Sequence, residues 1–160
     1  MSFTVTINIS RTFNTAASFE KVFELLSDVA KSGAFFPKTE KIVDLGNNIW
    51  RWEMERIGIG DYTLQQSIYA CKYISDKDQQ TVTWIPVEGI GNAIVDGKWE
   101  IMPTQKGCKV VLQSSGALTV SMAGFLEFFL SPLIRMEFEG IVDQYVANLK
   151  KEFEHDQVNR

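Results

Sequence analysis

The residues of this 160-residue chain that could take part in catalysis are few and far apart. The only histidine, His155, lies in a polar stretch near the C-terminal end, whereas a general base must lie within hydrogen-bond reach of its partner. Cys71 and Cys108 have no metal-binding spacing, which indicates reduced thiols. Gly89 and Gly91 lack the third glycine and the following helix of a phosphate-binding loop. We therefore expect no metal, no nucleotide cofactor and no histidine-based triad.

Composition narrows the class of protein further. The net charge is −4, and no segment combines clustered Lys or Arg with aromatic residues, so a nucleic-acid partner is not expected. The first ten residues alternate polar and apolar side chains, which indicates a strand and not a signal peptide. No apolar run is long enough to span a membrane. The sequence thus predicts one cytoplasmic domain over residues 1–160, with a polar tail at 155–160.

The N-terminal part is predicted to form one strand followed by two short helices. Phe3, Val5, Ile7, Ile9 and Phe13 alternate with polar residues, which is typical of a strand with one buried face. Ser18 can cap a helix that ends near residue 28. A shorter helix over about 29–35 follows and must stop before a proline at 37.

The middle of the chain is predicted to be six further strands joined by short turns. They cover Thr39–Leu45, Ile49–Ile57, Tyr62–Ile74, Gln80–Pro86, Ala93–Met102 and Lys109–Val120. Because no helix separates these strands, they are expected to pair antiparallel. The prediction is therefore an α+β fold with a seven-stranded antiparallel sheet.

One long amphipathic helix closes the chain. Ser131 suits its N-cap and Pro132 its first position, and the helix is expected to reach about Glu154. Its apolar residues recur at steps of three and four, as in Ile134, Phe138, Ile141, Val142, Tyr145, Leu149 and Phe153. Because this helix is the only element long enough to cover the sheet, we expect the sheet to curl around it.

This order of elements resembles the helix-grip fold of the START, polyketide cyclase and Bet v 1-like superfamily (SRPBCC). Three stretches carry the resemblance: SFEKVFELLSDVAKSGAFFP for the two short helices, GKWEIMPTQKGCKVVL for a hairpin, and SPLIRMEFEGIVDQYVANLKKEFE for the closing helix. The resemblance implies a cavity between sheet and helix that holds an apolar small molecule such as a lipid, an isoprenoid or a polyketide.

The alternation of each strand predicts which side chains face that cavity. Large aromatic residues with a few polar atoms are typical of small-molecule pockets. The predicted ligand-binding residues are Trp52, Met54, Arg56, Gln66, Ile68, Trp84, Trp99, Leu112, Ser114, Phe128, Phe138 and Tyr145. Arg56 could instead reach the rim, and Gly97 leaves a notch that admits a ligand or lets the sheet bend.

Three functions remain open at this stage. A carrier or sensor needs only the apolar cavity and no catalysis. A polyketide cyclase or aromatase would need polar side chains to converge there, namely Arg56, Gln66, Ser114, Tyr145 and Arg135. A protein-interaction module would use the apolar segment 122–130, which could also serve as a cavity gate or contact a membrane. The protein is expected to be a monomer or a homodimer.

Overall fold

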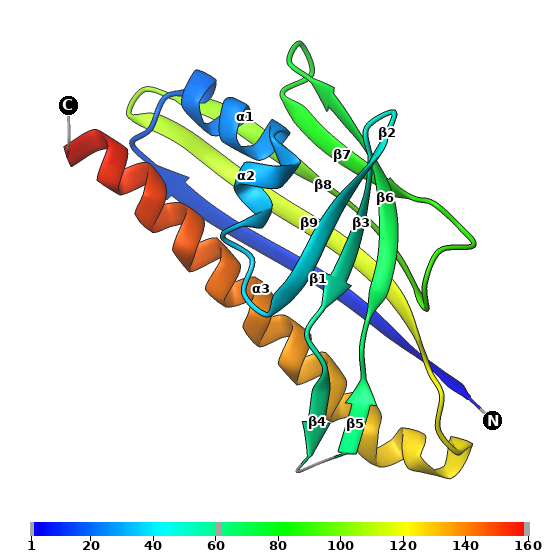
Figure 1. The fold of residues 1–160 in the computed structure, drawn as a ribbon. Helices are drawn as coiled ribbons and strands as arrows, with labels where there is room; N and C mark the ends of the chain where they lie inside the picture. The colour runs from blue at the N-terminus through cyan, green and yellow to red at the C-terminus, as the bar shows by residue number, and fades with distance from the viewer. Residues whose placement is uncertain (1, 60–61, 159–160) are drawn as a thin grey trace.

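The computed structural model describes residues 2–59 and 62–158, with side chains except at 57–59, 62–65 and 156–158. Its main sheet has seven antiparallel strands in the order β1-β9-β8-β7-β6-β3-β2. The helix α3 crosses one face of the sheet, and two short helices, α1 and α2, lie near its C-terminal end (Figure 1). These elements confirm the predicted α+β architecture. The bounds are β1 Phe3–Thr15, α1 Phe19–Ser27, α2 Val29–Gly33, β2 Thr39–Gly46, β3 Ile49–Met54, β4 Ile57–Ile59, β5 Tyr62–Gln65, β6 Ile68–Asp76, β7 Thr81–Pro86, β8 Ala93–Thr104, β9 Gly107–Val120, η1 Gly124–Leu126 and α3 Glu127–Val158.

Strands β1, β9 and β8 form the long and regular part of the sheet. β1 pairs with β9 without a register shift from Phe3 opposite Val120 to Thr15 opposite Cys108. β8 pairs with β9 over its whole length, also without a shift. The inward residues of β1 are buried and its outward residues are exposed, as the alternation predicts.

The strands predicted over 49–57 and 62–74 are each split in two. β3 ends at Met54 and β6 begins at Ile68, while β4 and β5 pair with each other in a separate ladder. The side chain of Asn92 explains the break, because it accepts a hydrogen bond from the Ile68 N–H at 2.9 Å and donates one to the Gln66 carbonyl at 2.7 Å. The Asn92 side chain thus takes up the hydrogen bonds of two main-chain groups that a continuous strand would pair with its neighbour.

The closing helix begins earlier than predicted. α3 starts at Glu127, directly after the 3₁₀ turn η1, so Ser131 is not the N-cap and Pro132 lies inside the helix. Leu130 is buried in the core, and this burial favours helix before the proline. Since Pro132 has no N–H, one helical hydrogen bond is lost there, and Figure 1 shows the first turns at an angle to the rest of α3.

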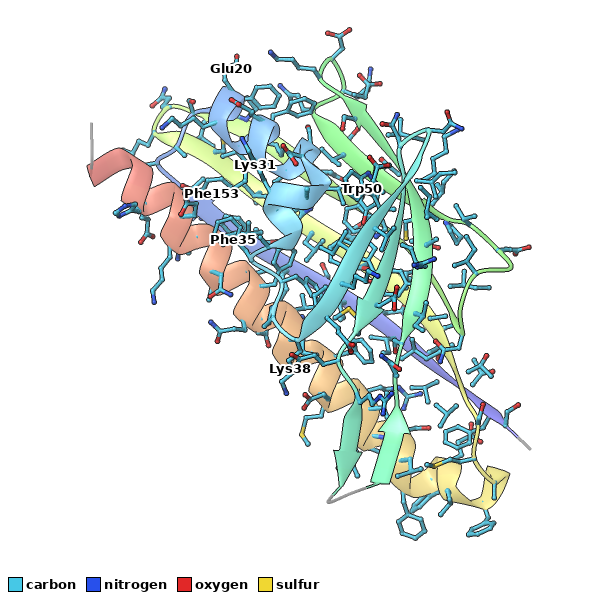
Figure 2. All side chains as sticks on the ribbon, viewed as in Figure 1. Glu20, Lys31, Phe35, Lys38, Trp50 and Phe153 are labelled. Atoms are coloured by element: carbon cyan, nitrogen blue, oxygen red, sulfur yellow. The ribbon has the colours of Figure 1, made fainter. Side chains whose placement is uncertain are left out.

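Polar contacts attach α3 to the regular part of the sheet and to the segment before β2. Arg11 on β1 forms an ion pair with Asp143, and Arg135 donates a hydrogen bond from Nε to the Thr6 carbonyl at 2.9 Å. Lys38, labelled in Figure 2, pairs with Glu137 of α3. The predicted apolar stripe of α3 faces the core, where Ile134, Leu149 and Phe153 are almost fully buried.

Candidate functional site

A cavity of about 110 Å³ lies between the inner face of the sheet, the short helices and α3. Figure 2 shows side chains between the sheet and the helices that cover it. The lining residues are Ile7, Ile9, Leu26, Val29, Ser32, Phe36, Trp52, Tyr69, Tyr73, Trp84, Val95, Trp99, Leu112, Ser114, Ser115, Gly116, Leu118, Phe138, Val142 and Tyr145. We refer to this space as the inner pocket.

The two sides of the inner pocket differ in chemistry. The long strands β1, β8 and β9 contribute mainly aliphatic and small residues, such as Ile9, Leu112 and Gly116. The short strands β3 and β6 contribute Trp52, Tyr69 and Tyr73, which combine an aromatic surface with a hydrogen-bonding atom. A bound molecule would therefore meet hydrocarbon on one side and polar aromatic groups on the other.

The aromatic side chains form a connected series around the pocket. The Trp52 ring stacks on Tyr69, with centroids 6.1 Å apart and an interplanar angle of 9°. Phe36 contacts the edge of Trp52 and also lies 4.8 Å from the Tyr145 ring. Ring pairs with centroids 4.5–7 Å apart stabilise one another beyond simple area burial. These contacts hold the pocket walls in a defined arrangement.

Burial keeps the ionisable groups of the pocket neutral. It raises the pKa of Tyr69 and Tyr73 well above the usual value, and it raises the pKa of Tyr145 to about 12 against an opposing hydrogen bond with Ser32. Burial also raises the pKa of the neighbouring Cys71 thiol to about 12. Among the described lining residues, none is Asp, Glu, Lys, Arg or His. The inner pocket is thus uncharged at neutral pH.

Seven of the residues predicted to face the cavity line the inner pocket. They come from four strands and from α3 and are brought together by the curved sheet. They are Trp52, Trp84, Trp99, Leu112, Ser114, Phe138 and Tyr145.

The other five predicted residues lie elsewhere. Met54 is buried beside Trp52 and Val29 but does not line the pocket, and Arg56 is exposed in the link between β3 and β4. Arg56 is placed there because β3 ends two residues before it, so the strand alternation no longer sets its direction. Gln66, Ile68 and Phe128 also lie outside the lining of the pocket.

On β6 the inward face is shifted by one residue from the prediction. Gln66 donates a hydrogen bond to the Met54 carbonyl at 3.3 Å, and neither Gln66 nor Ile68 lines the pocket. Tyr69 and Tyr73 face inward instead, because the break before Ile68 restarts the alternation, and a shift of one residue exchanges the two faces of a strand. The available signal was Lys72, whose charge marks the face that it shares with Ile68 as the outer one.

The notch predicted at Gly97 is filled by a side chain of the protein itself. A Cβ atom at Gly97 would lie 2.5 Å from the Trp84 ring. Trp84 pairs directly with Gly97 across β7 and β8. The glycine therefore makes room for a tryptophan of the pocket wall and not for a ligand.

The apolar segment 122–130 is divided between core and surface. Met122 and Leu126 pack against the core, whereas Phe125, Phe128 and Phe129 are 77%, 81% and 66% exposed. Phe128 does not line the inner pocket, contrary to the prediction, because its position at the start of α3 points it away from the sheet. With Leu133 and Met136 these three phenylalanines form an exposed apolar patch, which we call the α3 patch.

A second, larger hollow lies outside the sheet–helix core. It measures about 770 Å³ and runs between α1, α2, β3 and β6. Figure 2 labels two of its residues, Glu20 on α1 and Trp50 on β3. Glu20 is paired with Lys77 at 3.3 Å, and the surface is open and polar. The inner pocket is the better candidate site because it is less open and mainly apolar, with few polar atoms.

Two further observations concern metals and membranes. Within residues 2–59 and 62–158, no group of three or more His, Cys, Asp or Glu side chains is arranged to hold a metal ion. None of the described helices is both long and apolar enough to cross a bilayer.

Several solved structures share this architecture. An aromatase/cyclase from Streptomyces sp. R1128 is 17% identical, with a TM-score of 0.61 over 97% of this chain and 96% of that chain. A START superfamily protein from Mycobacterium smegmatis is 15% identical, with a TM-score of 0.63 over 92% and 97%. Norcoclaurine synthase from Thalictrum flavum is 18% identical, with a TM-score of 0.58 over 97% and 98%.

Sequence comparison adds no closer relationship. No protein-family model and no curated protein sequence matches the chain. The structural likenesses nevertheless extend over nearly the whole of both chains. They confirm that the protein has the helix-grip fold of START, polyketide cyclase and Bet v 1-like proteins.

Proposed function

We propose that the protein binds a small, uncharged, largely apolar molecule in the inner pocket and does not transform it chemically. The observation that carries this proposal is the largely apolar, aromatic-rich lining without a charged side chain among its described residues. Apolar walls with a few polar atoms are typical of ligand sites.

The volume of the pocket favours a compact ligand. A cavity of about 110 Å³ is slightly smaller than an engineered protein cavity of about 150 Å³ that binds benzene. A molecule of one or two rings, such as a small isoprenoid or a fragment of polyketide type, fits this size better than a long acyl chain. A full lipid would require the walls to move apart.

The protonation states of the pocket support binding over catalysis. General acids and bases work best when their pKa lies near the working pH. The pocket tyrosines stay protonated, and the pKa of Tyr145 is about 12. Arg56 is exposed, and Arg135 bonds to the Thr6 carbonyl. The convergence of polar groups that a cyclase would need is therefore missing among the described residues, and a shared fold does not transfer an activity.

Native mass spectrometry of gently purified protein tests this proposal. The wild type should retain an apolar molecule, and Ser114→Leu should lose it because the larger side chain occupies the pocket. Gln113→Leu is the matched control, since Gln113 is the exposed neighbour on the opposite face of β9. An empty wild type that also binds no small aromatic probe would contradict the proposal.

The α3 patch favours a second function, contact with another protein. Large exposed apolar patches often mark the surface through which a protein contacts a partner. Sedimentation velocity over a range of concentrations should show association of the wild type that Phe128→Ser abolishes. Phe128 is 81% exposed, so the substitution leaves the core intact. A monomer at every concentration would count against self-association through this patch.

A further inference from the structure

The indole N–H of Trp52 is a buried donor without a hydrogen-bond partner. Trp52 is 6% exposed and lines the inner pocket, and its Nε1 makes no hydrogen bond of regular geometry with any described residue. Buried polar groups in native proteins are almost always hydrogen-bonded. A donor left in this state at a pocket wall indicates an acceptor that the protein itself does not supply.

The orientation of the Trp52 ring is set by its neighbours. A Cβ atom placed on Gly33 of α2 would lie 3.0 Å from Cη2 and 3.6 Å from Cζ3 of the indole. These atoms form the far edge of the six-membered ring, so the five-membered ring with its N–H lies at the end away from α2. Tyr69 stacks on the indole and Phe36 packs on it edge-on, which holds the ring in place.

Tyr73 adds a second donor next to this N–H. Its hydroxyl lies close enough to the Trp52 indole N–H to be influenced by it, but the two groups do not form a hydrogen bond of regular geometry. The hydroxyl stays protonated because burial, the largest effect, and then the neighbouring Cys71, Tyr69 and Tyr145 raise its pKa, although the indole N–H favours the phenolate. Two neutral donors from β3 and β6 therefore lie on the same side of the pocket.

The rest of the lining limits what can bind these donors. A charged ligand would lose its hydration without meeting an opposite charge, which is costly. The opposite wall is mainly hydrocarbon, with Ile7, Ile9 and Leu112, and its serine hydroxyls are neutral. From these contacts we infer that the inner pocket selects an uncharged one- or two-ring aromatic molecule with a carbonyl oxygen that accepts a hydrogen bond from Trp52. This inference rests on the proposed function and specifies the chemical class of its ligand.

Three probes of similar size and different polarity test the inference. Acetophenone has the ring and the carbonyl, ethylbenzene lacks the oxygen, and benzoate carries a charge. Calorimetric titration should show that Trp52→Phe weakens acetophenone binding about tenfold and leaves ethylbenzene binding unchanged, since one hydrogen bond is lost. Trp99→Phe, a matched change in another pocket tryptophan, should affect both probes equally. Benzoate should not bind at the same concentrations.

A spectroscopic measurement keeps the test independent of how the variants fold. In ¹H–¹⁵N spectra of the wild type, the Trp52 indole proton should move downfield with acetophenone and stay in place with ethylbenzene. Equal binding of both probes without this shift would overturn the inference and leave the proposed function intact, as would benzoate binding as tightly as acetophenone. If none of the probes binds and the purified protein is empty, the proposed function itself fails.

Discussion

The two halves of the main sheet are built differently. β1, β9 and β8 are 12 to 14 residues long and pair without a register shift. β2 and β3 are short and have two shifts in their pairing, and both β3 and β6 meet an interruption at the same end. We call these the regular half and the interrupted half.

This difference separates stability from recognition. The regular half carries α3 and the largest cluster of fully buried aliphatic residues, whereas the interrupted half supplies Trp52, Tyr69 and Tyr73 to the inner pocket. Regular pairing keeps the inward and outward alternation in step, while the break before Ile68 turns two tyrosines inward. The buried donors of Trp52 and Tyr73 thus come from the part of the sheet that departs from ideal geometry.

The largest expected effect tests whether the regular half supplies most of the stability. Phe153 is 1% exposed and stacks on Phe13 of β1 with centroids 6.3 Å apart. Phe153→Ala should lower the free energy of unfolding by about 3–5 kcal/mol in urea titration, because it removes a buried ring and leaves a cavity. Phe125→Ala, an exposed phenylalanine, should change it by less than about 0.5 kcal/mol. Equal effects would contradict the comparison.

Alkaline pH should lower the free energy of unfolding, because buried ionisable groups on β6 and Tyr145 on α3 must stay protonated in the folded protein. Buried Tyr69, Tyr73, Cys71 and Tyr145 have a higher pKa when folded than when unfolded. Their contribution is complete below the unfolded pKa of about 9–10 and is lost as the pH rises toward the folded values. Tyr145 alone should contribute about 2–3 kcal/mol of this loss by pH 12. Unfolding titrations should show a shallower decline for Tyr145→Phe, and a flat profile in the wild type would be inconsistent with this account.

A smaller loss of stability is expected where β8 of the regular half pairs with β7. Gly97→Ala would place a methyl group 2.5 Å from both the Trp84 ring and the Gln113 carbonyl oxygen, so we expect a loss of about 1–3 kcal/mol in thermal unfolding. The control is Gly116→Ala on β9, where the nearest atom would lie at 3.6 Å, an ordinary contact. Similar melting temperatures for both variants would show that Trp84 moves aside easily.

The smallest effect concerns the attachment of α3 to the regular half. The ion pair of Arg11 and Asp143 joins side chains that are 30% and 58% exposed, so solvent screens it. Asp143→Asn should cost less than about 1 kcal/mol, and the difference from the wild type should shrink in high salt. A loss that persists at high salt would indicate a role beyond charge.

The regular half could be predicted from the sequence, and the interrupted half only in part. In β1, β8 and β9 most of the alternate residues are apolar, with Arg11 and Ser114 among the exceptions, so the inward positions of Trp99, Leu112 and Ser114 follow from local pattern alone. On β6 the alternation is restarted by Asn92, which is distant in sequence, and no local signal announces that contact. The start of α3 was mispredicted for a similar reason, because burial of Leu130 outweighed the capping signal of Ser131-Pro132.

The position of β1 has a consequence for how the chain folds. β1 comes first in the sequence, yet its partner in the sheet is β9, the last strand to be synthesised. During synthesis its apolar face must wait for residues 107–120 and then for α3, and pairing across such a separation is slow. A nascent chain that stalls before β9 exposes both an unpaired strand and an apolar surface, which favours aggregation. We therefore expect the yield of folded protein in the cell to depend on how fast the last third of the chain is made.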